Sequence, residues 1–253
     1  MAIQKAEVFV LKTQPYRSSS LILTFYSKPF GKIRGIAKGV RREGEIRGAV
    51  YELFTHLEIV FYEKTRSDLH LISEASIIES HDPLRARLET IAYASYFSEL
   101  VDLVTEAHDP HEKIFELLDF AFHFLPSLAT EHLSRLFEIK LLHEVGWLPY
   151  LKACLGCRET KFEAGFFSIQ QGALFCSRCA LQWPDARPLD ADVLAVMRYY
   201  IAHDLESSMK FRTTPQTDVQ LAKLMEQFLL FRLNRTLKSR QFIHEIKPAL
   251  ASS

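Results

Sequence analysis

Four cysteines constrain the fold of this chain more than any other feature of its sequence. They form two pairs, Cys154-Leu-Gly-Cys157 and Cys176-Ser-Arg-Cys179, with eighteen residues between the pairs. A two-residue gap lets both thiolates of a pair bind one ion from a single tight turn. A second pair completes the tetrahedron that Zn²⁺ prefers. Because the spacing is typical of a four-cysteine zinc ribbon, we predict one structural Zn²⁺ bound by Cys154, Cys157, Cys176 and Cys179.

Three other roles for the cysteines stay open at this point. Disulfides would require an oxidising compartment, but the N-terminus does not read as a signal peptide, because a lysine interrupts its apolar run. A redox-active pair would be expected within a thioredoxin-like βαβ pattern, which surrounds neither pair. A catalytic zinc keeps an open position, and four sulfur ligands leave none. Between the pairs, residues 165–169 and 173–175 flank Gln171-Gly172 and predict a small hairpin.

The composition places the chain among folded intracellular proteins. Of its 253 residues, 48% are hydrophobic and 25% are charged, so it can bury a core and is not globally disordered. Its apolar stretches are short and interrupted by charge, so we expect no membrane span and a cytoplasmic location. The formal net charge is zero. Any nucleic-acid binding must therefore come from a local excess of positive charge.

The first 80 residues have the pattern of a small β domain. Short runs rich in β-branched and aromatic residues alternate with turn-forming residues, and we predict strands over residues 6–11, 21–26, 32–37, 56–62 and 69–78. Five short strands at regular spacing indicate a barrel or sandwich, and the OB fold is the five-stranded barrel of that group.

A helical pattern replaces the strand pattern at Asp82-Pro83, where Asp82 can cap a helix and Pro83 suits its first turn. Apolar spacing predicts helices over residues 83–104, 110–126, 130–146, 190–203 and 217–237. The predicted fold class is therefore α+β and multidomain. An OB-fold domain occupies residues 1–80, and a helical bundle occupies residues 81–253, with the zinc-ribbon insert at about residues 150–182.

A basic segment runs through the β domain from residue 28 to residue 47. It contains seven basic residues and two acidic ones, Glu43 and Glu45. A basic strand followed by a basic loop can contact phosphates, and the nearby aromatic residues Tyr16, Phe25, Tyr26 and Phe30 could stack on bases. The alternative is a solvated strand face with its aromatics in the core. The predicted DNA contacts are Lys32, Arg34, Lys38, Arg41, Arg42 and Arg47.

Motifs for catalysis and nucleotide binding are missing from the sequence. Lys32 follows Gly31, but the other residues of a P-loop are absent. There is no GxSxG, HExxH or GxGxxG motif after a predicted strand, and the histidines are scattered. We therefore predict no catalytic residues, no enzyme activity and no nucleotide cofactor.

Four stretches, taken in order, resemble the bacterial RecO family of DNA repair and recombination mediators. Residues 30–42 resemble the family's GKxxGxAKGxRR, and residues 96–102 its YxxELxD helix. Residues 137–157 resemble FxxxLLxxxGxxPxxxxCxxC, and residues 237–240 the LKSR that ends its final helix. Two departures are Glu43-Gly-Glu45 after the paired arginines and Arg17-Ser-Ser-Ser20 in place of an acidic turn.

The resemblance implies an N-terminal OB fold, a helical domain with a zinc insert, and action on DNA in the RecF pathway without an active site. It implies binding of single- and double-stranded DNA and annealing of complementary strands. It also implies that the protein associates with the nucleoid and, together with RecR, helps RecA to load onto DNA coated by single-strand-binding protein. The alternative function is a zinc-stabilised protein-interaction adaptor that binds little DNA directly, which the zero net charge would suit.

Overall fold

The computed structural model describes residues 2–40, 46–64, 67–161 and 165–250, except for the side chains of residues 46, 47, 249 and 250. The chain divides into two compact units. Unit 1 comprises residues 1–130 and 237–253, and unit 2 comprises residues 131–236. Within the described ranges, none of the helices combines the length and apolar character needed to cross a membrane.

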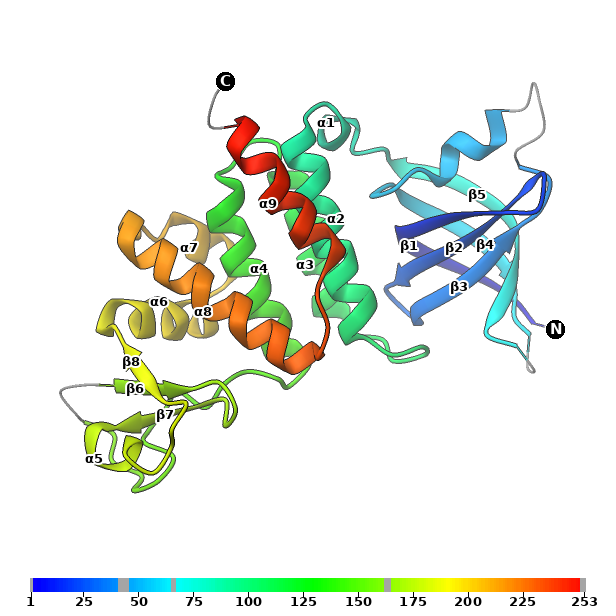
Figure 1. Cartoon of the computed structure of the whole chain (residues 1–253). Coiled ribbons are helices and arrows are strands. Elements are labelled where there is room, and N and C mark those ends of the chain that lie inside the picture. The colour runs from blue at the N-terminus through cyan, green and yellow to red at the C-terminus, as the bar shows by residue number, and fades with distance from the viewer. Residues whose placement is uncertain (1, 41–45, 65–66, 162–164, 251–253) are drawn as a thin grey trace. The chain divides into compact units, whose positions relative to one another are not determined.

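Unit 1 is built on a closed barrel of five strands, drawn from blue to cyan in Figure 1. The strands are β1 (Ile3–Tyr16), β2 (Ser20–Ser27), β3 (Gly31–Ala37), β4 (His56–Tyr62) and β5 (Leu69–Glu79), and a short 3₁₀ helix, η1 (Ile46–Tyr51), precedes β4. Their order around the barrel is β1-β2-β3-β5-β4, with β3 and β5 parallel and the other pairs antiparallel. The barrel confirms the predicted fold class.

The barrel closes because alternate side chains of each strand point to one face. In β4, for example, Leu57, Ile59 and Phe61 are buried, while the residues between them are partly exposed. Among the described residues the barrel core contains fourteen buried ones, to which every strand contributes together with Val40 and with Tyr51 of η1. Phe25 and Leu23 are fully enclosed in it. Burying one large apolar side chain contributes about 1.5–3 kcal/mol, so apolar burial accounts for the stability of the barrel.

Three helices of unit 1 follow the barrel along the chain: α1 (Asp82–Arg85), α2 (Leu88–Val104) and α3 (Glu112–Phe124). The expectation of one helix from residue 83 to residue 104 is wrong, because Arg87 is extended and separates α1 from α2. Asp82 is the first residue of α1, and its N-cap is His81 in a left-handed conformation. Phe9 of β1 packs on α3, with ring centroids 4.7 Å from Phe115 and 5.5 Å from Phe122.

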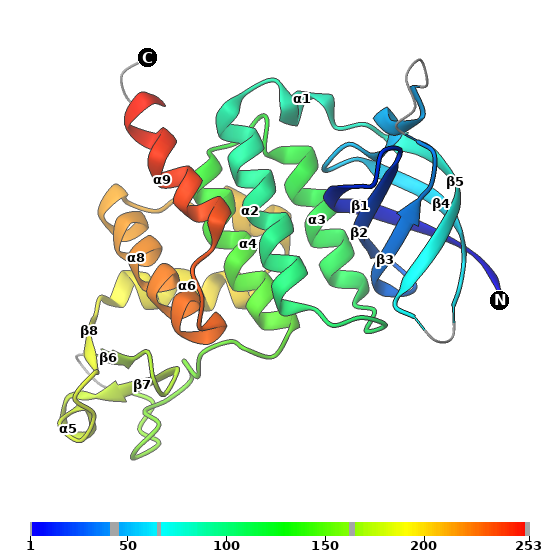
Figure 2. The ribbon, with the colours of Figure 1, turned by 45° about the vertical axis from the view of Figure 1, so that its right-hand side comes forward.

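The fourth helix of unit 1, α9 (Lys238–Leu250), comes from the far end of the chain and lies beside α2 (Figures 1 and 2). Glu99 of α2 accepts hydrogen bonds from the backbone N–H groups of Lys238 and Ser239, at 3.1 and 2.8 Å. This carboxylate stabilises the positive end of the α9 dipole. The sequence reading missed α9, because it placed residues 237–240 at the end of a helix, whereas they lie at its start.

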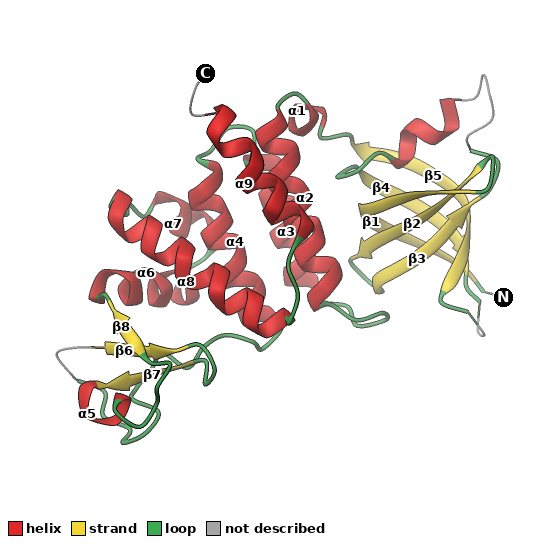
Figure 3. Ribbon diagram, in the orientation of Figure 1, coloured by secondary structure: helices red, strands yellow, loops and turns green. Residues whose placement is uncertain are grey.

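Unit 2 contains helices α4 (Thr130–Glu144), α6 (Ala191–Ala202), α7 (Leu205–Lys210) and α8 (Pro215–Leu233), and a small sheet (Figure 3). Thr214 caps α8, because its side chain accepts a hydrogen bond from the Thr217 N–H, and the left-handed Asn234 ends it. The sheet has the order β7-β6-β8, from β6 (Gly165–Ser168), β7 (Ala173–Cys176) and β8 (Arg187–Leu189). The hairpin β6–β7 is the one predicted, whereas β8 and α7 were missed.

Candidate metal centre and nucleic-acid surface

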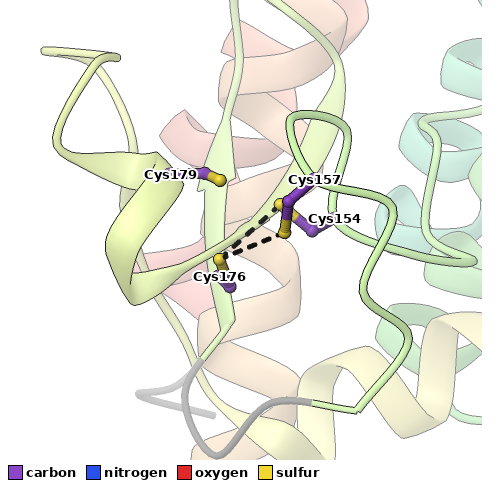
Figure 4. Close-up of side chains that lie close together, drawn as sticks. All are labelled: Cys154, Cys157, Cys176 and Cys179. Atoms are coloured by element: carbon purple, nitrogen blue, oxygen red, sulfur yellow. Dashed lines mark hydrogen bonds between the residues drawn. The ribbon is translucent and has the colours of Figure 1, made fainter.

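The four cysteines come together at one end of the small sheet of unit 2 (Figure 4). Cys154 and Cys157 lie on one turn, Cys176 is the last residue of β7, and Cys179 lies in the short helix α5 (Ser177–Ala180). The Sγ atom of Cys176 is 3.8 Å from the Sγ atoms of both Cys154 and Cys157, and all four sulfurs lie within 4.8 Å of one another.

These separations fit one tetrahedral metal ion. A Zn–S distance of about 2.3 Å gives a tetrahedron whose sulfur–sulfur edges are about 3.8 Å. The four thiols therefore already have the size of a tetrathiolate site. Four sulfur ligands leave no open coordination position, so the arrangement suits a structural ion rather than a catalytic one.

The backbone of the first turn explains how Cys154 and Cys157 are held. The Cys154 N–H donates to the Glu159 carbonyl at 2.8 Å, and the Leu155 N–H donates to the Leu174 carbonyl of β7, also at 2.8 Å. These bonds fix the turn to the hairpin that carries the second pair. Gly156 is required for a steric reason, because a Cβ atom at this position would lie only 3.0 Å from the Cys179 Sγ atom.

The local field of the cluster favours thiolates at its buried side. Burial raises the pKa of the Cys154 thiol, but hydrogen bonds from the backbone N–H groups of Cys157 and Cys176 outweigh it and lower the pKa to about 6. The Cys179 pKa is raised to about 12, first by its hydrogen bond with Cys176 and then by burial. The Arg178 side chain donates a hydrogen bond to Cys157, which raises the pKa of this guanidinium. A positive group therefore accompanies the sulfurs.

Two basic residues of the segment from residue 28 to residue 47 bind partners within unit 1 through their ammonium groups. The Lys28 ammonium forms an ion pair with Glu112 at 2.8 Å. Lys32 donates to the backbone carbonyls of Asp102 and Thr105 at 2.6 and 2.7 Å, and its side chain is 16% exposed. A cation at the end of α2 stabilises the last carbonyls of this helix. The contact of Lys32 with DNA stays a prediction, and the structure gives its ammonium another partner.

The remaining predicted DNA contacts fall into two groups. Arg34 and Lys38 are exposed, and neither forms an ion pair with a carboxylate of the described residues. Arg41 and Arg42 lie outside the described residues, as do Glu43 and Glu45, and the side chain of Arg47 in η1 is also not described.

Strand register adds two basic residues that the sequence reading did not select. Lys12 of β1 pairs with Thr24 of β2, which pairs with Arg34 of β3, so all three lie in one row on the outer face of the barrel. With strands about 4.8 Å apart, Lys12 and Arg34 lie about 10 Å apart. Arg17 is exposed in the β1–β2 turn, near the end of β3 that carries Lys38. We call Lys12, Arg17, Arg34 and Lys38 the basic edge.

The aromatic residues near the basic edge differ in how far their rings are exposed for stacking on bases. Phe25 and Tyr26 are fully buried, so the expectation that these two stack on bases is wrong. Phe30 is partly buried and packs edge-on against Phe61, and its stacking on a base stays a prediction. Tyr16 is 37% exposed, and the Arg17 guanidinium lies over its ring at 5.3 Å. Tyr16 is therefore the exposed aromatic side chain of this group, and it can stack on a base.

Comparisons with known proteins show which family the sequence of both units resembles. Residues 1–81 match the model of the family described as recombination protein O N terminal, and residues 85–241 match recombination protein O C terminal. A DNA repair protein RecO from Halalkalibacterium halodurans is 30% identical over 244 residues, covering 96% of this chain and 95% of the relative. Proteins of the same name from Alkaliphilus metalliredigens and Syntrophus aciditrophicus are each 31% identical, covering 91% and 97% of this chain and 94% and 97% of their own lengths.

Proposed function

The chain belongs to the recombination protein O (RecO) family of DNA repair and recombination proteins, and from this premise we propose that its barrel binds DNA through the basic edge. The proposed mediator binds single- and double-stranded DNA in the nucleoid and anneals complementary strands. With RecR, it assists the loading of RecA onto DNA coated by single-strand-binding protein. It acts without a catalytic site and without a nucleotide cofactor.

One observation carries this proposal: the outer face of the barrel holds basic side chains that have no acidic partner. Lys28 and Lys32 are neutralised by Glu112 and Asp102. Arg34, Lys38 and Lys12, in contrast, are exposed and form no ion pair within the described part of the chain. In a chain of zero formal net charge, this is a local excess of the kind that phosphates would neutralise.

Annealing requires neutralised backbones and accessible bases, and the basic edge suits both needs. Positive charge on an exposed barrel face lowers the repulsion between two phosphate backbones. Tyr16 is 37% exposed and offers one stacking position for a base beside this charge. A strand held in this way keeps most of its base edges free for pairing.

The direct test is a salt titration of oligonucleotide binding by fluorescence anisotropy, comparing wild type with the double variant Arg34→Glu/Lys38→Glu. Each phosphate contact to a single strand contributes about 0.7 to the slope of log affinity against log salt. We expect the double variant to bind more weakly and its slope to fall by about 1.4. The control is Lys152→Glu/Lys223→Glu, which makes the same charge change at two exposed residues of unit 2.

Equal affinity and slope for wild type and Arg34→Glu/Lys38→Glu would exclude the basic edge and would favour the adaptor function instead. Annealing is tested separately with complementary strands coated by single-strand-binding protein, with and without the protein and RecR. We expect faster annealing with wild type, and slower annealing with the basic-edge variant than with the unit 2 control. An equal rate with and without protein would contradict the mediator function.

We also propose that the ion at the four cysteines is Zn²⁺ and that its role is structural. The sulfur spacing of 3.8 Å and the complete four-sulfur ligand set support this identity. Elemental analysis of purified protein should find one Zn²⁺ bound with tetrathiolate character, and Cys176→Ser should lose it. DNA affinity of the basic edge should change little, because the cysteines and the barrel belong to different units.

A further inference from the structure

A second group of metal-binding side chains lies in unit 1, away from the cysteines in sequence. Glu79 is the last residue of β5, His81 follows it before α1, and Asp119 lies in α3. One ligand atom from each of the three lies within 4.8 Å of the others. The His81 Nδ1 atom is 3.2 Å from the Glu79 Oε1 atom, and the His123 Nδ1 atom is 4.0 Å from the same oxygen.

The distances have the scale of a metal coordination sphere. Nitrogen and carboxylate oxygen ligands bind Zn²⁺ at about 2.0–2.2 Å, so neighbouring ligand atoms of a tetrahedral site are about 3.3–3.6 Å apart. The two separations around Glu79 Oε1, 3.2 and 4.0 Å, lie on either side of this range. Glu79, His81 and Asp119 thus form the compact part of the group, and His123 lies at its margin.

The charge of the group is not balanced by a permanent cation. Within the described residues, neither Glu79 nor Asp119 forms an ion pair with lysine or arginine. Arg85 of α1, which follows His81 along the chain, is paired with Glu52 and Asp82. Two carboxylates that lie together without a counter-charge repel each other, and a divalent cation removes this repulsion.

His81 is held in position before any ligand binds. Its backbone is left-handed, with φ 52° and ψ 37°, a conformation that is uncommon for a residue other than glycine. Its side chain is 2% exposed and packs against the rings of Phe9 and Phe122.

The geometry points to a second metal site, in which Glu79, His81 and Asp119 bind a first-row divalent ion of the Zn²⁺ type and His123 supplies a fourth ligand. Imidazole and carboxylate ligands suit such an ion and distinguish this site from the sulfur-only cysteine cluster. The ion would join the last residue of barrel strand β5 to α3. It would thus fix the barrel to the helices of unit 1 at the edge of the aromatic contact made by Phe9.

The test is a titration of the metal-stripped full chain with Co²⁺, which replaces Zn²⁺ and absorbs light. Cysteine ligands give intense thiolate-to-cobalt charge-transfer bands, whereas imidazole and carboxylate ligands give only weak d–d bands. We expect two Co²⁺ ions per chain, the second bound without further charge-transfer absorbance. The variant Asp119→Asn keeps the size of an exposed side chain and should weaken the second Co²⁺ by at least about tenfold, the lower limit of what even an outer ligand partner contributes.

Further variants separate coordination from general charge effects. Glu79→Gln should behave as Asp119→Asn does, and His123→Gln should give a smaller loss. Glu74→Gln is the matched control, because it removes an exposed carboxylate from the same strand β5 and should leave the second ion bound. His81 itself is not substituted, because its loss would disturb the aromatic packing. Binding of one Co²⁺ only, or a second Co²⁺ that is unaffected by Asp119→Asn, would overturn the proposal, whatever the result at the cysteines.

Discussion

The barrel of unit 1 and the ribbon of unit 2 are both small β structures, but they are stabilised in opposite ways. The barrel buries fourteen residues in one apolar core. The cluster around the cysteines has four buried residues, and two of these, Cys154 and Cys176, belong to the proposed metal site. If the cysteines bind the proposed ion, the same secondary structure depends on apolar burial in one place and on a metal ion in another.

The largest expected effect is the loss of the ribbon when the metal is removed. In zinc-binding peptides the metal contributes about 10–16 kcal/mol of folding free energy, and the ribbon has little core to replace it. We expect Cys154→Ser, or chelation of wild type, to abolish protection of the β6 and β7 backbone amides in hydrogen-exchange mass spectrometry. Protection of β2 and β4 should be unchanged. If the backbone amides of β6 and β7 stay protected without metal, the ribbon does not depend on the ion for its fold, and the proposed contrast with the barrel is wrong.

The complementary change tests the barrel. Phe25 is fully buried in its core, and replacing a buried phenylalanine by alanine costs about 3–5 kcal/mol. We expect Phe25→Ala to lower the free energy of unfolding of unit 1, measured in urea, by this amount, while the metal content of the cysteine cluster stays at the wild-type value. The exposed Leu181→Ala is the control, since that side chain is 86% exposed and should change neither quantity.

An intermediate effect is expected at Lys32, where the barrel meets α2. Hydrogen bonds of a charged group contribute about 1.5–3 kcal/mol, so Lys32→Gln should destabilise unit 1 by about this amount by urea unfolding. The partner variant Lys28→Gln removes only a surface ion pair and should destabilise unit 1 less than Lys32→Gln does. Unchanged stability in Lys32→Gln would show that the ammonium does not support the end of α2.

The smallest expected effect is that of low pH on the stability of unit 1. Burial lowers the pKa values of His56 and His70 below the ordinary 6.5, so the unfolded chain takes up protons more readily than the folded one. The stability of unit 1 should therefore decline as the pH falls below 6.5, and in Asp119→Asn, which weakens the proposed second ion, the decline should be the same with and without metal. In the ribbon, acid acts by protonating thiolates, so its loss should depend on metal concentration. Stability curves at two metal concentrations distinguish the causes.

Much of the architecture follows from local patterns in the sequence. All five strands of the barrel were predicted, because alternation of apolar residues and turn residues marks each one. The cysteine cluster was also predictable, since the ligand spacing of a ribbon is a local property. Helix α9 was missed because the signal that starts it is not local: Glu99, 139 residues earlier, caps its N-terminus.

The basic edge was predicted least completely, because the number of charged residues in a segment does not show which of them form ion pairs in the fold. Lys32 and Arg34 look alike in the sequence, yet Asp102 pairs with Lys32 across 70 residues and leaves Arg34 exposed. Lys12 became part of the basic edge only through strand register with Thr24. The group around Glu79 was equally hidden, because Asp119 reaches it from another element.

The return of α9 to α2 has a consequence for how the protein is made. Residues 131–236 form unit 2, and both chain segments on either side of them belong to unit 1. The ribosome therefore delivers the barrel first and the whole of unit 2 next, and only then supplies the helix whose first turn Glu99 binds. Until that helix emerges, one face of α2 stays uncovered. Unit 1 begins first during synthesis and is completed last.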